Sequence, residues 1–326
     1  MVLLFEYSFL AVATFFITEL KMGKHTVWEL KQKQSLPLDA KIQMTRLRLK
    51  QWHIKYEGGV YLAFSGGKDS TVLKHILSEL FPDVPSVYCN TGLEYPEIKK
   101  FALSQDNVTV ITPKMMFKDV INTYGYPVIS KEQSSYIDEI RNTKSDKLRD
   151  LRLNGRNGSY KLSDKWKFML NAPFKISDHC CDVMKKAPFK LYEKETGRKV
   201  IVGTMTDESI LRLNSWLKFG CNAFDSHRPM SRPMSFWTEQ DVLHYIVKYN
   251  LKIASVYGDI VQDENGKYHT TGCDRTGCMF CMYGIQKDRV PNRFQRMQQT
   301  HPRQYQFCLN ELGIKDVLEY MNIPYK

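Results

Sequence analysis

The sequence predicts an α/β fold in which a mainly parallel sheet is wound by helices on both faces. Two observations lead to this prediction. Short apolar runs typical of buried strands alternate with helical patterns along the chain, at Val60–Phe64, Ser86–Cys89, Val108–Ile111 and Lys199–Val202. The first run ends in a glycine turn that leads directly into a helical pattern. Strands alternating with helices form parallel sheets, whose ligands bind at the carboxyl ends of the strands.

A helical extension, residues 1–57, is expected ahead of the sheet. Val2 to Ile17 is nearly apolar, but Glu6 interrupts it and it has no basic start. It is also shorter than the about 20 apolar residues of a membrane span. We interpret it as a start-site extension or an extra packed helix, with a signal or membrane anchor as the alternative. Residues 24–56 predict one or two helices, broken at Leu36-Pro37.

The turn after the first strand has the features of a phosphate-binding loop. Its glycines let backbone amides approach an anion, and the following helix start adds unpaired N–H groups and a positive dipole end. Lysine supplies a mobile cation and two serines supply hydroxyl donors. An ordinary capped turn is the alternative. The predicted phosphate ligands are Ser65, Gly66, Gly67, Lys68, Asp69 and Ser70.

Two further turns follow predicted strands at their carboxyl ends. Asn90-Thr91-Gly92-Leu93-Glu94 follows the second strand, and Gly203-Thr204 follows the run KVIV. Because ligands of parallel sheets bind at that edge, we expect Thr91, Gly92, Glu94 and Gly203 to contribute to the nucleotide site.

The composition excludes wholesale disorder and points to an anionic partner. The 326 residues are 43% hydrophobic and 25% charged, with a formal net charge of +12. That charge suits nucleotide phosphates, sulfate or a nucleic acid without choosing among them. A basic insertion at 131–170, rich in Lys, Arg, Asn and Ser, interrupts the predicted α/β domain, residues 58–250. We interpret it as a solvated helical hairpin, and the alternative is a polymer-binding element.

The remaining residues, 251–326, are expected to form a cysteine-rich and helical C-terminal region. Just before it, Ser235 to Tyr249 predicts an amphipathic helix, in which Thr238 can cap the start and Asp241 can complete the cap. Two further helices are expected beyond it.

Four of the eight cysteines form a candidate metal centre: Cys180, Cys181, Cys278 and Cys281. Four thiolates at this spacing suit tetrahedral zinc or an iron–sulfur cluster. Adjacent cysteines aim poorly at one ion but can bind neighbouring irons, so we favour [4Fe–4S] over zinc and over a catalytic dithiol. This use of cysteine implies a reducing, cytoplasmic setting. The isolated thiols Cys89, Cys221 and Cys308 are expected to be small buried residues.

Other side chains are candidates for binding or chemistry. We interpret Cys273, five residues before Cys278, as a ligand, as a thiol that lies beside the ligands, or as a reactive sulfur. Arg212 and Arg228 each offer a guanidinium fork suited to sulfate or phosphate. His179, beside the paired cysteines, has a packing or surface role, with tuning of the cluster as the alternative.

These motifs together resemble the adenylyl-sulfate and phosphoadenylyl-sulfate (PAPS) reductase family within the adenine nucleotide alpha hydrolase-like superfamily. SGGKDS resembles the pyrophosphate loop, NTGLEYPE the D-T-G-x-x-F/Y-P-E turn, and CC…CxxC the cluster ligands of the iron–sulfur branch. GTMTDESILR and RPMSFWTEQDVLHYI are similar to two further family segments. The resemblance runs from about Val60 to Cys281. It implies the fold of that superfamily and a role for Arg212 on substrate oxygens.

Three departures from the family pattern bear on the reaction. The phosphate loop is intact, as in enzymes that split ATP to AMP and pyrophosphate, whereas the reductases carry a degenerate loop. The C-terminus, YMNIPYK, has no E-C-G-L-H motif with the sulfonyl-attacking cysteine. Met205 stands where the substrate segment usually has an arginine.

Three functions follow from the resemblance. The first is adenylation of a substrate for sulfur insertion, with ATP and Mg²⁺ at the phosphate loop, Lys68 and Asp69 in catalysis, and nucleic acid as a candidate substrate. The second is reduction of PAPS or adenylyl sulfate to sulfite, with a thioredoxin-like electron donor and Cys273 as the thiol. The third is a non-catalytic nucleotide-binding regulator. We also expect a homo-oligomer with no membrane association.

Overall fold

The computed structural model describes residues 24–326, which divide into two compact units. The expected N-terminal extension or anchor lies outside the described residues. The first unit contains residues 24–88, Pro96–Ile111 and Tyr192–Arg275, and the second contains Cys89–Tyr95, Thr112–Leu191 and Thr276–Lys326. The sequence-based boundaries after residues 57 and 250 stay a prediction.

The first unit is built on a six-stranded sheet in the order β3-β2-β1-β5-β7-β6. β1 pairs in parallel with β2 and β5, β5 pairs in parallel with β7, and β6 pairs antiparallel with β7 at the edge. The strands are β1 (Val60–Phe64), β2 (Ser86–Cys89), β3 (Val108–Ile111), β5 (Lys199–Val202), β6 (Asn222–Ala223) and β7 (Met230–Ser231). The predicted mainly parallel α/β fold is confirmed.

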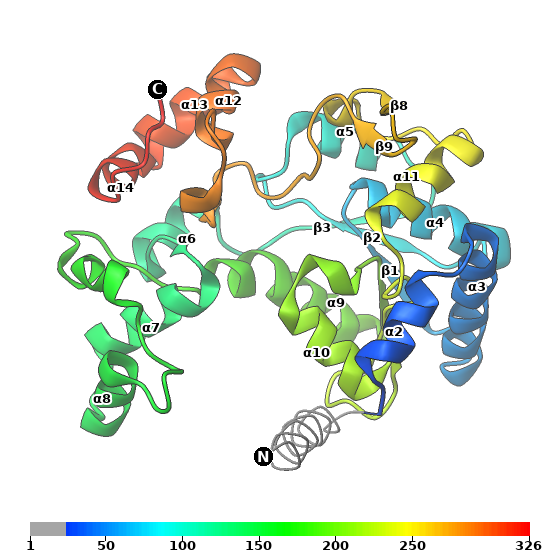
Figure 1. The fold of residues 1–326 in the computed structure, drawn as a ribbon, viewed down its shortest axis with the longest axis horizontal. Helices are drawn as coiled ribbons and strands as arrows, with labels where there is room; N and C mark the ends of the chain where they lie inside the picture. Colours follow the sequence, from blue (N-terminus) through cyan, green and yellow to red (C-terminus); the bar gives the residue numbers. More distant parts are fainter. Residues whose placement is uncertain (1–23) are drawn as a thin grey trace, which may run out of the picture. The chain divides into compact units, whose positions relative to one another are not determined.

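Alternation along β1 sends side chains to both faces of the sheet. Val60, Leu62 and Phe64 belong to the core of the first unit, while Tyr61 between them contacts Tyr192 on α9. α4 packs on β1 and is in contact with α3 and α11. Figure 1 shows α3 and α4 on one side of the strands and α9 on the other. The helices are α2 (Val27–Gln34), α3 (Leu38–Lys55), α4 (Lys68–Leu80), α5 (Pro96–Leu103), α9 (Ala187–Thr196), α10 (Ile210–Phe219) and α11 (Glu239–Lys248).

The expected start of α11 is confirmed in detail. The Thr238 side chain accepts a hydrogen bond from the Asp241 amide, and the Asp241 carboxylate accepts one from the Thr238 amide. This reciprocal pair satisfies two N–H groups of the first turn. The predicted break at Leu36-Pro37 separates α2 from α3.

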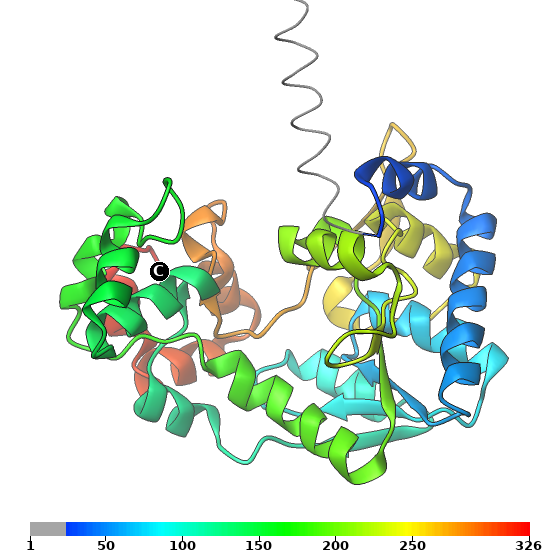
Figure 2. The same ribbon diagram turned by 90° about the horizontal axis from the view of Figure 1, so that it is seen from below.

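The second unit is mainly helical around its own apolar core. β4 (Val128–Ile129) and β10 (Met282–Tyr283) form a short parallel pair at its centre. Its helices are α6 (Phe117–Tyr124), α7 (Lys131–Asn142), α8 (Asp146–Asn154), α12 (Arg293–Thr300), α13 (Pro302–Gln306) and α14 (Ile314–Tyr320). The basic insertion forms the expected helical hairpin, because α7 packs on α8. Figure 2 shows this helical part from a second direction.

The C-terminal region differs from the expectation of two helices. Three short helices, α12 to α14, follow the cysteines, and the first unit gains a hairpin of β8 (Ile260–Gln262) and β9 (Tyr268–Thr270). Strands of two or three residues are too short to show a period of two, so the sequence pattern could not indicate them. No helix among residues 24–326 is long and apolar enough to span a bilayer.

Candidate functional site

The predicted phosphate turn joins β1 to α4 in the first unit. Gly67 is the N-cap of α4 and offers no side-chain cap, so the first amides of the helix have no capping oxygen from this residue. The Ser65 and Ser70 hydroxyls lie 3.0 Å apart, and Ser70 Oγ donates to the Gly67 carbonyl at 2.9 Å. These bonds fix the turn around the helix start. Such a start is a ready anion site.

Two glycines allow this turn to pack as it does. Gly66 has φ +72°, and a Cβ there would lie 3.0 Å from both the Ile98 side chain and carbonyl. Gly203, at the carboxyl end of β5, runs so close to α4 that a Cβ would come 3.2 Å from the Asp69 carbonyl oxygen. The structure therefore brings predicted Gly203 to the helix start, together with Ser65–Ser70.

Lys68 is buried at the start of α4 and is held by three other segments of the first unit. Its side chain is 3% exposed. Nζ donates to the Asp274 carbonyl at 2.6 Å and forms an ion pair with Glu239 Oε1 at 3.0 Å. Its backbone amide donates to the Tyr257 hydroxyl at 3.3 Å. The cation is thus positioned within the turn and does not extend into solvent.

Asp69 lies next to this cation in a buried setting. Burial raises the pKa of its carboxyl, while Lys68 and Arg275 act in the opposite direction. Its Oδ1 has no hydrogen-bond partner among the described residues. A buried carboxylate oxygen without a partner is costly, and Mg²⁺ is a hard cation that prefers such ligands. The residues present therefore fit a Mg²⁺–phosphate ligand at this turn.

The arginines of the substrate-like segment have separate partners. Arg212, at the start of α10, pairs with Glu208, and the same carboxylate pairs with Arg275. Burial lowers the pKa of Arg212, and the charge of Arg275 lowers it further. Arg228 instead forms a two-pronged pair with Glu193, at 2.9 Å and 2.6 Å. Arg212 therefore shares a partner with Arg275, which influences Asp69, while the fork of Arg228 is engaged with α9.

Cys273 lies in the first unit, in the segment that contacts Lys68. Its amide donates to the Val256 carbonyl at 2.9 Å, and its carbonyl accepts from Thr270 Oγ1 at 3.0 Å. The next residue, Asp274, accepts the hydrogen bond from Lys68 Nζ. Cys273 is not among the residues that line the pocket of the four other candidate cysteines.

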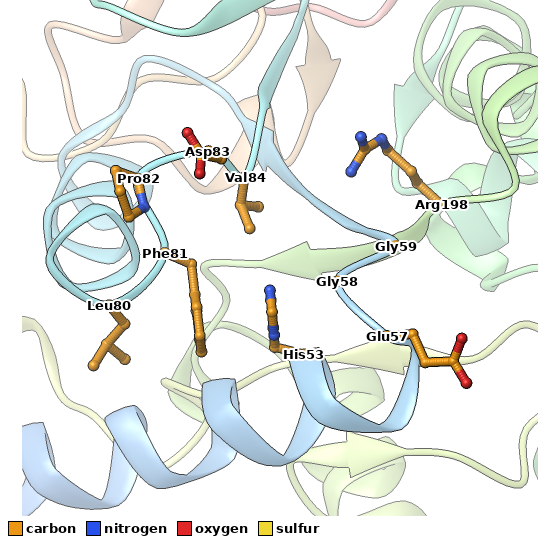
Figure 3. A pocket seen from close by; sticks show the side chains of 10 residues that line it. All are labelled: His53, Glu57, Gly58, Gly59, Leu80, Phe81, Pro82, Asp83, Val84 and Arg198. Carbon is orange, nitrogen blue, oxygen red and sulfur yellow. The ribbon is translucent and has the colours of Figure 1, made fainter.

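A cavity of about 580 Å³ lies at the opposite end of the strands of the first unit (Figure 3). Gly59 precedes β1, Val84 precedes β2, and Arg198 precedes β5, so the cavity lies at the amino ends of the strands. His53 and Phe81 stack there with ring centroids 3.8 Å apart. None of the predicted site residues lines it, in keeping with ligand binding at carboxyl ends.

The second predicted turn, in the second unit, is closed by its own carboxylate. Glu94 Oε1 accepts a hydrogen bond from Thr91 Oγ1 at 2.6 Å, and Oε2 accepts one from the Thr91 amide at 3.1 Å. Gly92 between them has φ +74°. The role of Thr91, Gly92 and Glu94 in nucleotide binding stays a prediction.

The four predicted cysteine ligands line one pocket of the second unit. Cys180 and Cys181 begin the helical segment that continues into α9, and Cys278 and Cys281 precede β10. Apolar and aromatic side chains complete the lining: Leu93, Phe117, Pro127, Phe280 and Tyr283. Burial raises the pKa of Cys180 and Cys278, and it raises the pKa of Cys281 to about 11. Iron or zinc would offset this cost, because metal binding deprotonates a thiol.

Lys185 provides a positive charge beside these sulfurs. Burial alone would lower the pKa of its ammonium, but Cys278 and Glu94 raise it above the ordinary value. Four cysteines with a half-buried cation beside them are a donor set that fits an anionic iron–sulfur cluster. Among the described residues, no group of three or more His, Cys, Asp or Glu side chains has an arrangement suited to a metal ion. The cluster therefore stays a prediction.

His179 packs against a ring rather than a sulfur. Its imidazole stacks on Tyr124, with centroids 5.1 Å apart and ring planes within 5°. Nδ1 is 3.9 Å from carboxylate oxygens of Asp138 and Asp178. These contacts are those of a packing residue.

A model of a known protein family matches the part of the chain that carries the phosphate turn and the four cysteines. The model of the phosphoadenosine phosphosulfate reductase domain matches residues 59–148 and 130–283, more than half of the chain. The chain belongs to this family. The match covers the phosphate turn and all four cysteines, so the resemblance drawn from the motifs is confirmed. No curated protein gives a significant match.

Solved structures similar to this family member share little sequence with it. PAPS reductase from Candida auris is 14% identical, with 72% of this chain and 98% of that chain covered and a TM-score of 0.37. FMN adenylyltransferase from Candida glabrata is 9% identical, with 70% and 64% covered and a TM-score of 0.39. The U34-tRNA thiolase of Methanococcus maripaludis, solved with its [4Fe-4S] cluster, is 14% identical, with 85% and 80% covered and a TM-score of 0.34.

Several residues near the two sites were missed by sequence reasoning. Lys185 lies four residues after Cys181, and a spacing of four places side chains on one helix face, so the sequence held a signal for it. Glu208 lies four residues before Arg212, so the sequence held the same kind of signal for it. Arg275 gave no such signal, because its contact with Glu208 joins distant segments. The same is true of Tyr257 and Glu239 beside Lys68.

Proposed function

We propose that this PAPS reductase-family chain is an enzyme that uses ATP to adenylate an acceptor oxygen, which sulfur then replaces. The observation that carries the proposal is the intact Ser65–Ser70 turn. Its buried cation, Lys68, and its unpartnered carboxylate oxygen on Asp69 are side by side at a helix start. This is an arrangement suited to Mg²⁺ and a triphosphate tail rather than to a sulfate ester alone.

In the proposed first step, the acceptor oxygen attacks the α-phosphorus of ATP. A P–O bond forms, the bond to the bridging oxygen of the β-phosphate breaks, and pyrophosphate leaves with that electron pair. Lys68 and the α4 amides would neutralise charge on the leaving group, and Asp69 would hold the Mg²⁺ bound to it. Most of the catalysis would be orientation and charge stabilisation.

In the proposed second step, hydrosulfide (HS⁻) attacks the substrate atom that carries the adenylated oxygen. A bond to sulfur forms, the bond to the adenylated oxygen breaks, AMP leaves with the electron pair, and the sulfur loses its proton to water. When bound, a [4Fe–4S] cluster supplies sulfide binding or electron transfer. Cys180, Cys181, Cys278 and Cys281 would hold it, and Lys185 would offset the negative charge of cluster and sulfide.

The test is pyrophosphate release from ATP by anaerobically purified protein that is supplied with RNA and DNA as candidate acceptors. We expect Lys68→Ala to lower the rate by about 100-fold, because the variant loses its main phosphate cation. Lys74→Ala is the matched control: Lys74 lies on the same helix and also donates to a carbonyl, that of Asp106, at 2.8 Å. Equal rates in the two variants, or no release by the wild type, would contradict the proposal.

Iron and labile-sulfide analysis tests the cluster separately. Cys180→Ser and Cys281→Ser should lose iron, whereas Cys308→Ser, at a buried thiol outside the pocket, should retain it. If the analysis finds zinc and no iron, the four cysteines bind a single zinc ion and the proposed cluster is wrong.

Reduction of PAPS or adenylyl sulfate to sulfite is the second candidate. It is favoured by Cys273, because its neighbour Asp274 contacts Lys68 and so places a thiol-bearing segment beside the phosphate turn. The assay is thioredoxin-dependent sulfite formation, lost on Cys273→Ser and retained on Cys221→Ser, a buried thiol elsewhere in the first unit. Nucleotide binding with neither reaction would identify a non-catalytic regulator.

A further inference from the structure

The segment that follows α7 concentrates positive charge on the second unit. Residues 144–168 contain eight lysines and arginines but only three aspartates, a net of five positive charges in a chain whose net charge is +12. They comprise α8 and the loop that leads to Trp166. We call residues 144–168 the α8 surface. Figure 1 shows α8 beside α7.

Half of these cations have no acidic partner among the described residues. Arg149 pairs with Asp146, Arg152 pairs with Glu139, and Lys161 and Lys167 both pair with Asp164. The other exposed cations form no ion pair within residues 24–326: Lys144, Lys147, Arg156 and Lys165. Solvated cations whose charge is not offset locally attract a polyanion and release its counterions.

An aromatic ring projects from the same surface. Tyr160 is 60% exposed, and its φ of +65° places a bulky residue in the left-handed region. It follows a tight turn in which Arg156 and Ser159 exchange backbone hydrogen bonds of 2.9 Å and 3.0 Å. Arg152 Nη1 donates to the Tyr160 carbonyl at 3.3 Å. Strain of this kind persists only where the surroundings enforce it, so the backbone that carries the exposed ring is held in place.

The base of the α8 surface is fixed to the core of the second unit. The Arg152 guanidinium lies over the Tyr136 ring at 4.3 Å, and the Leu162 amide donates to the Arg152 carbonyl at 2.7 Å. Leu162 and Trp166 are buried in the same core as Cys180. The ring and the cations are therefore presented on a packed scaffold.

We propose that the α8 surface binds single-stranded nucleic acid, with a base stacked on Tyr160 and phosphates near Arg156, Lys165, Lys144 and Lys147. An exposed ring in one segment with solvated cations matches the way proteins bind single strands, in which bases stack on aromatic side chains while cations follow the backbone. A duplex has no free base face to stack on the ring. The identification of this bound strand as the acceptor of adenylation rests on the proposed function. The binding of single-stranded nucleic acid does not depend on it.

The experiment measures fluorescence anisotropy of labelled oligouridylate, oligothymidylate and a DNA duplex with the full chain, without ATP. We expect the single strands to bind more tightly than the duplex. Tyr160→Ala should weaken single-strand binding by about tenfold, and Tyr160→Phe should retain it, because stacking needs the ring and not the hydroxyl. Preference between the two single strands identifies RNA or DNA as the source.

The charge contribution is measured as salt dependence. The double variant Arg156→Ala/Lys165→Ala should reduce the slope of log affinity against log salt by about 1.4, the value for two single-strand phosphate contacts. The matched controls are Trp28→Ala, an exposed ring 68% accessible on α2, and Lys99→Ala/Lys100→Ala, exposed cations on α5. Both should bind as the wild type does, and circular dichroism verifies folding.

Tighter binding to duplex, no salt-dependent binding, or equal losses in Tyr160→Ala and Trp28→Ala would each overturn the inference. Because no step uses ATP, its failure is distinct from a failure of pyrophosphate release. Binding without any ATP turnover would support the α8 surface and count against the adenylation reaction.

Discussion

Glu208 holds Arg212 and Arg275 together, because both guanidinium groups form ion pairs with its one carboxylate. The two arginines come from α10 and from the segment after β9. The charge of each acts to lower the pKa of Asp69 in the phosphate turn. A pair of guanidinium groups on one carboxylate leaves positive charge in excess. This excess positive charge would attract an anion bound at the turn.

Arg275→Ala should therefore weaken ATP binding by about tenfold, since hydrogen bonds to charged groups contribute about 1.5–3 kcal/mol. Arg275→Lys should recover part of the loss, because it keeps the charge without the fork. Titration calorimetry measures both. The control is Arg46→Ala, which breaks an Arg–Glu pair with Glu79 elsewhere in the first unit. Equal affinities in Arg275→Ala and Arg46→Ala would remove Arg275 from the site.

Asp69→Asn should stabilise the fold and slow turnover. Burial raises the pKa of this carboxyl, so the folded state binds its proton more tightly than the unfolded state does. The stabilisation is present below the ordinary Asp pKa and is lost as pH rises through the raised value. At pH 7 the neutral asparagine should therefore add on the order of 1 kcal/mol to the free energy of unfolding.

The same substitution removes the proposed Mg²⁺ ligand, and we expect pyrophosphate release to fall about 100-fold. Urea unfolding and the release assay measure the two effects on one preparation. Asp225→Asn is the contrast, because Asp225 is exposed and Lys24 holds its pKa below the usual range. It should leave turnover unchanged and bring no gain in stability. A destabilised Asp69→Asn protein would show that the carboxylate is well compensated in the fold.

Lys185→Ala should lower the reduction potential of the proposed cluster. Reduction adds negative charge, and a nearby ammonium favours the reduced form, so its loss disfavours reduction. The expected shift is on the order of tens of millivolts, read from a spectroscopic redox titration. Lys186→Ala is the control, since Lys186 is exposed and pairs with Asp182 at 2.6 Å. Identical potentials in the two variants would separate Lys185 from the cluster.

Local sequence signals predicted the parts of this molecule whose structure is set locally. The run Val60–Phe64, the two glycines and the Lys68 helix start are consecutive in the chain, so strand, turn and helix could each be recognised. The cap of α11 also depends on only four residues. The chemistry of cysteine also allowed a prediction over long distances in the sequence, because thiols with the spacing of metal ligands are expected to lie together at one centre.

Contacts between distant segments could not be predicted in this way. Lys68 and Asp274 are 206 positions apart, and the bond between them is made to a backbone carbonyl, which carries no residue-specific signal. The pairing of Met282 with Val128 places the second cysteine pair on the core of its unit, yet two-residue strands show no periodicity. Such features follow from packing of the whole unit.

Arg293 contacts the backbone of the second cysteine pair, and we expect the effect of its loss on the free energy of unfolding to depend on pH. It forms a two-pronged pair with Asp288, at 2.9 Å and 2.8 Å, and its Nη1 donates to the Cys281 carbonyl at 3.0 Å. Hydrogen bonds from Arg293 hold the pKa of Asp288 below its usual range. This stabilisation is present above the ordinary Asp pKa of about 3.9 and is lost as pH falls through the lowered value.

Arg293→Ala should therefore cost about 2 kcal/mol in the free energy of unfolding at pH 7. The difference from wild type should shrink as Asp288 is protonated. Urea unfolding at neutral and strongly acidic pH measures both values. Arg303→Ala, at an exposed arginine on α13, controls for loss of charge and should show little change at either pH. A difference between Arg293→Ala and wild type that stays constant with pH would mean that Arg293 acts by packing and not through Asp288.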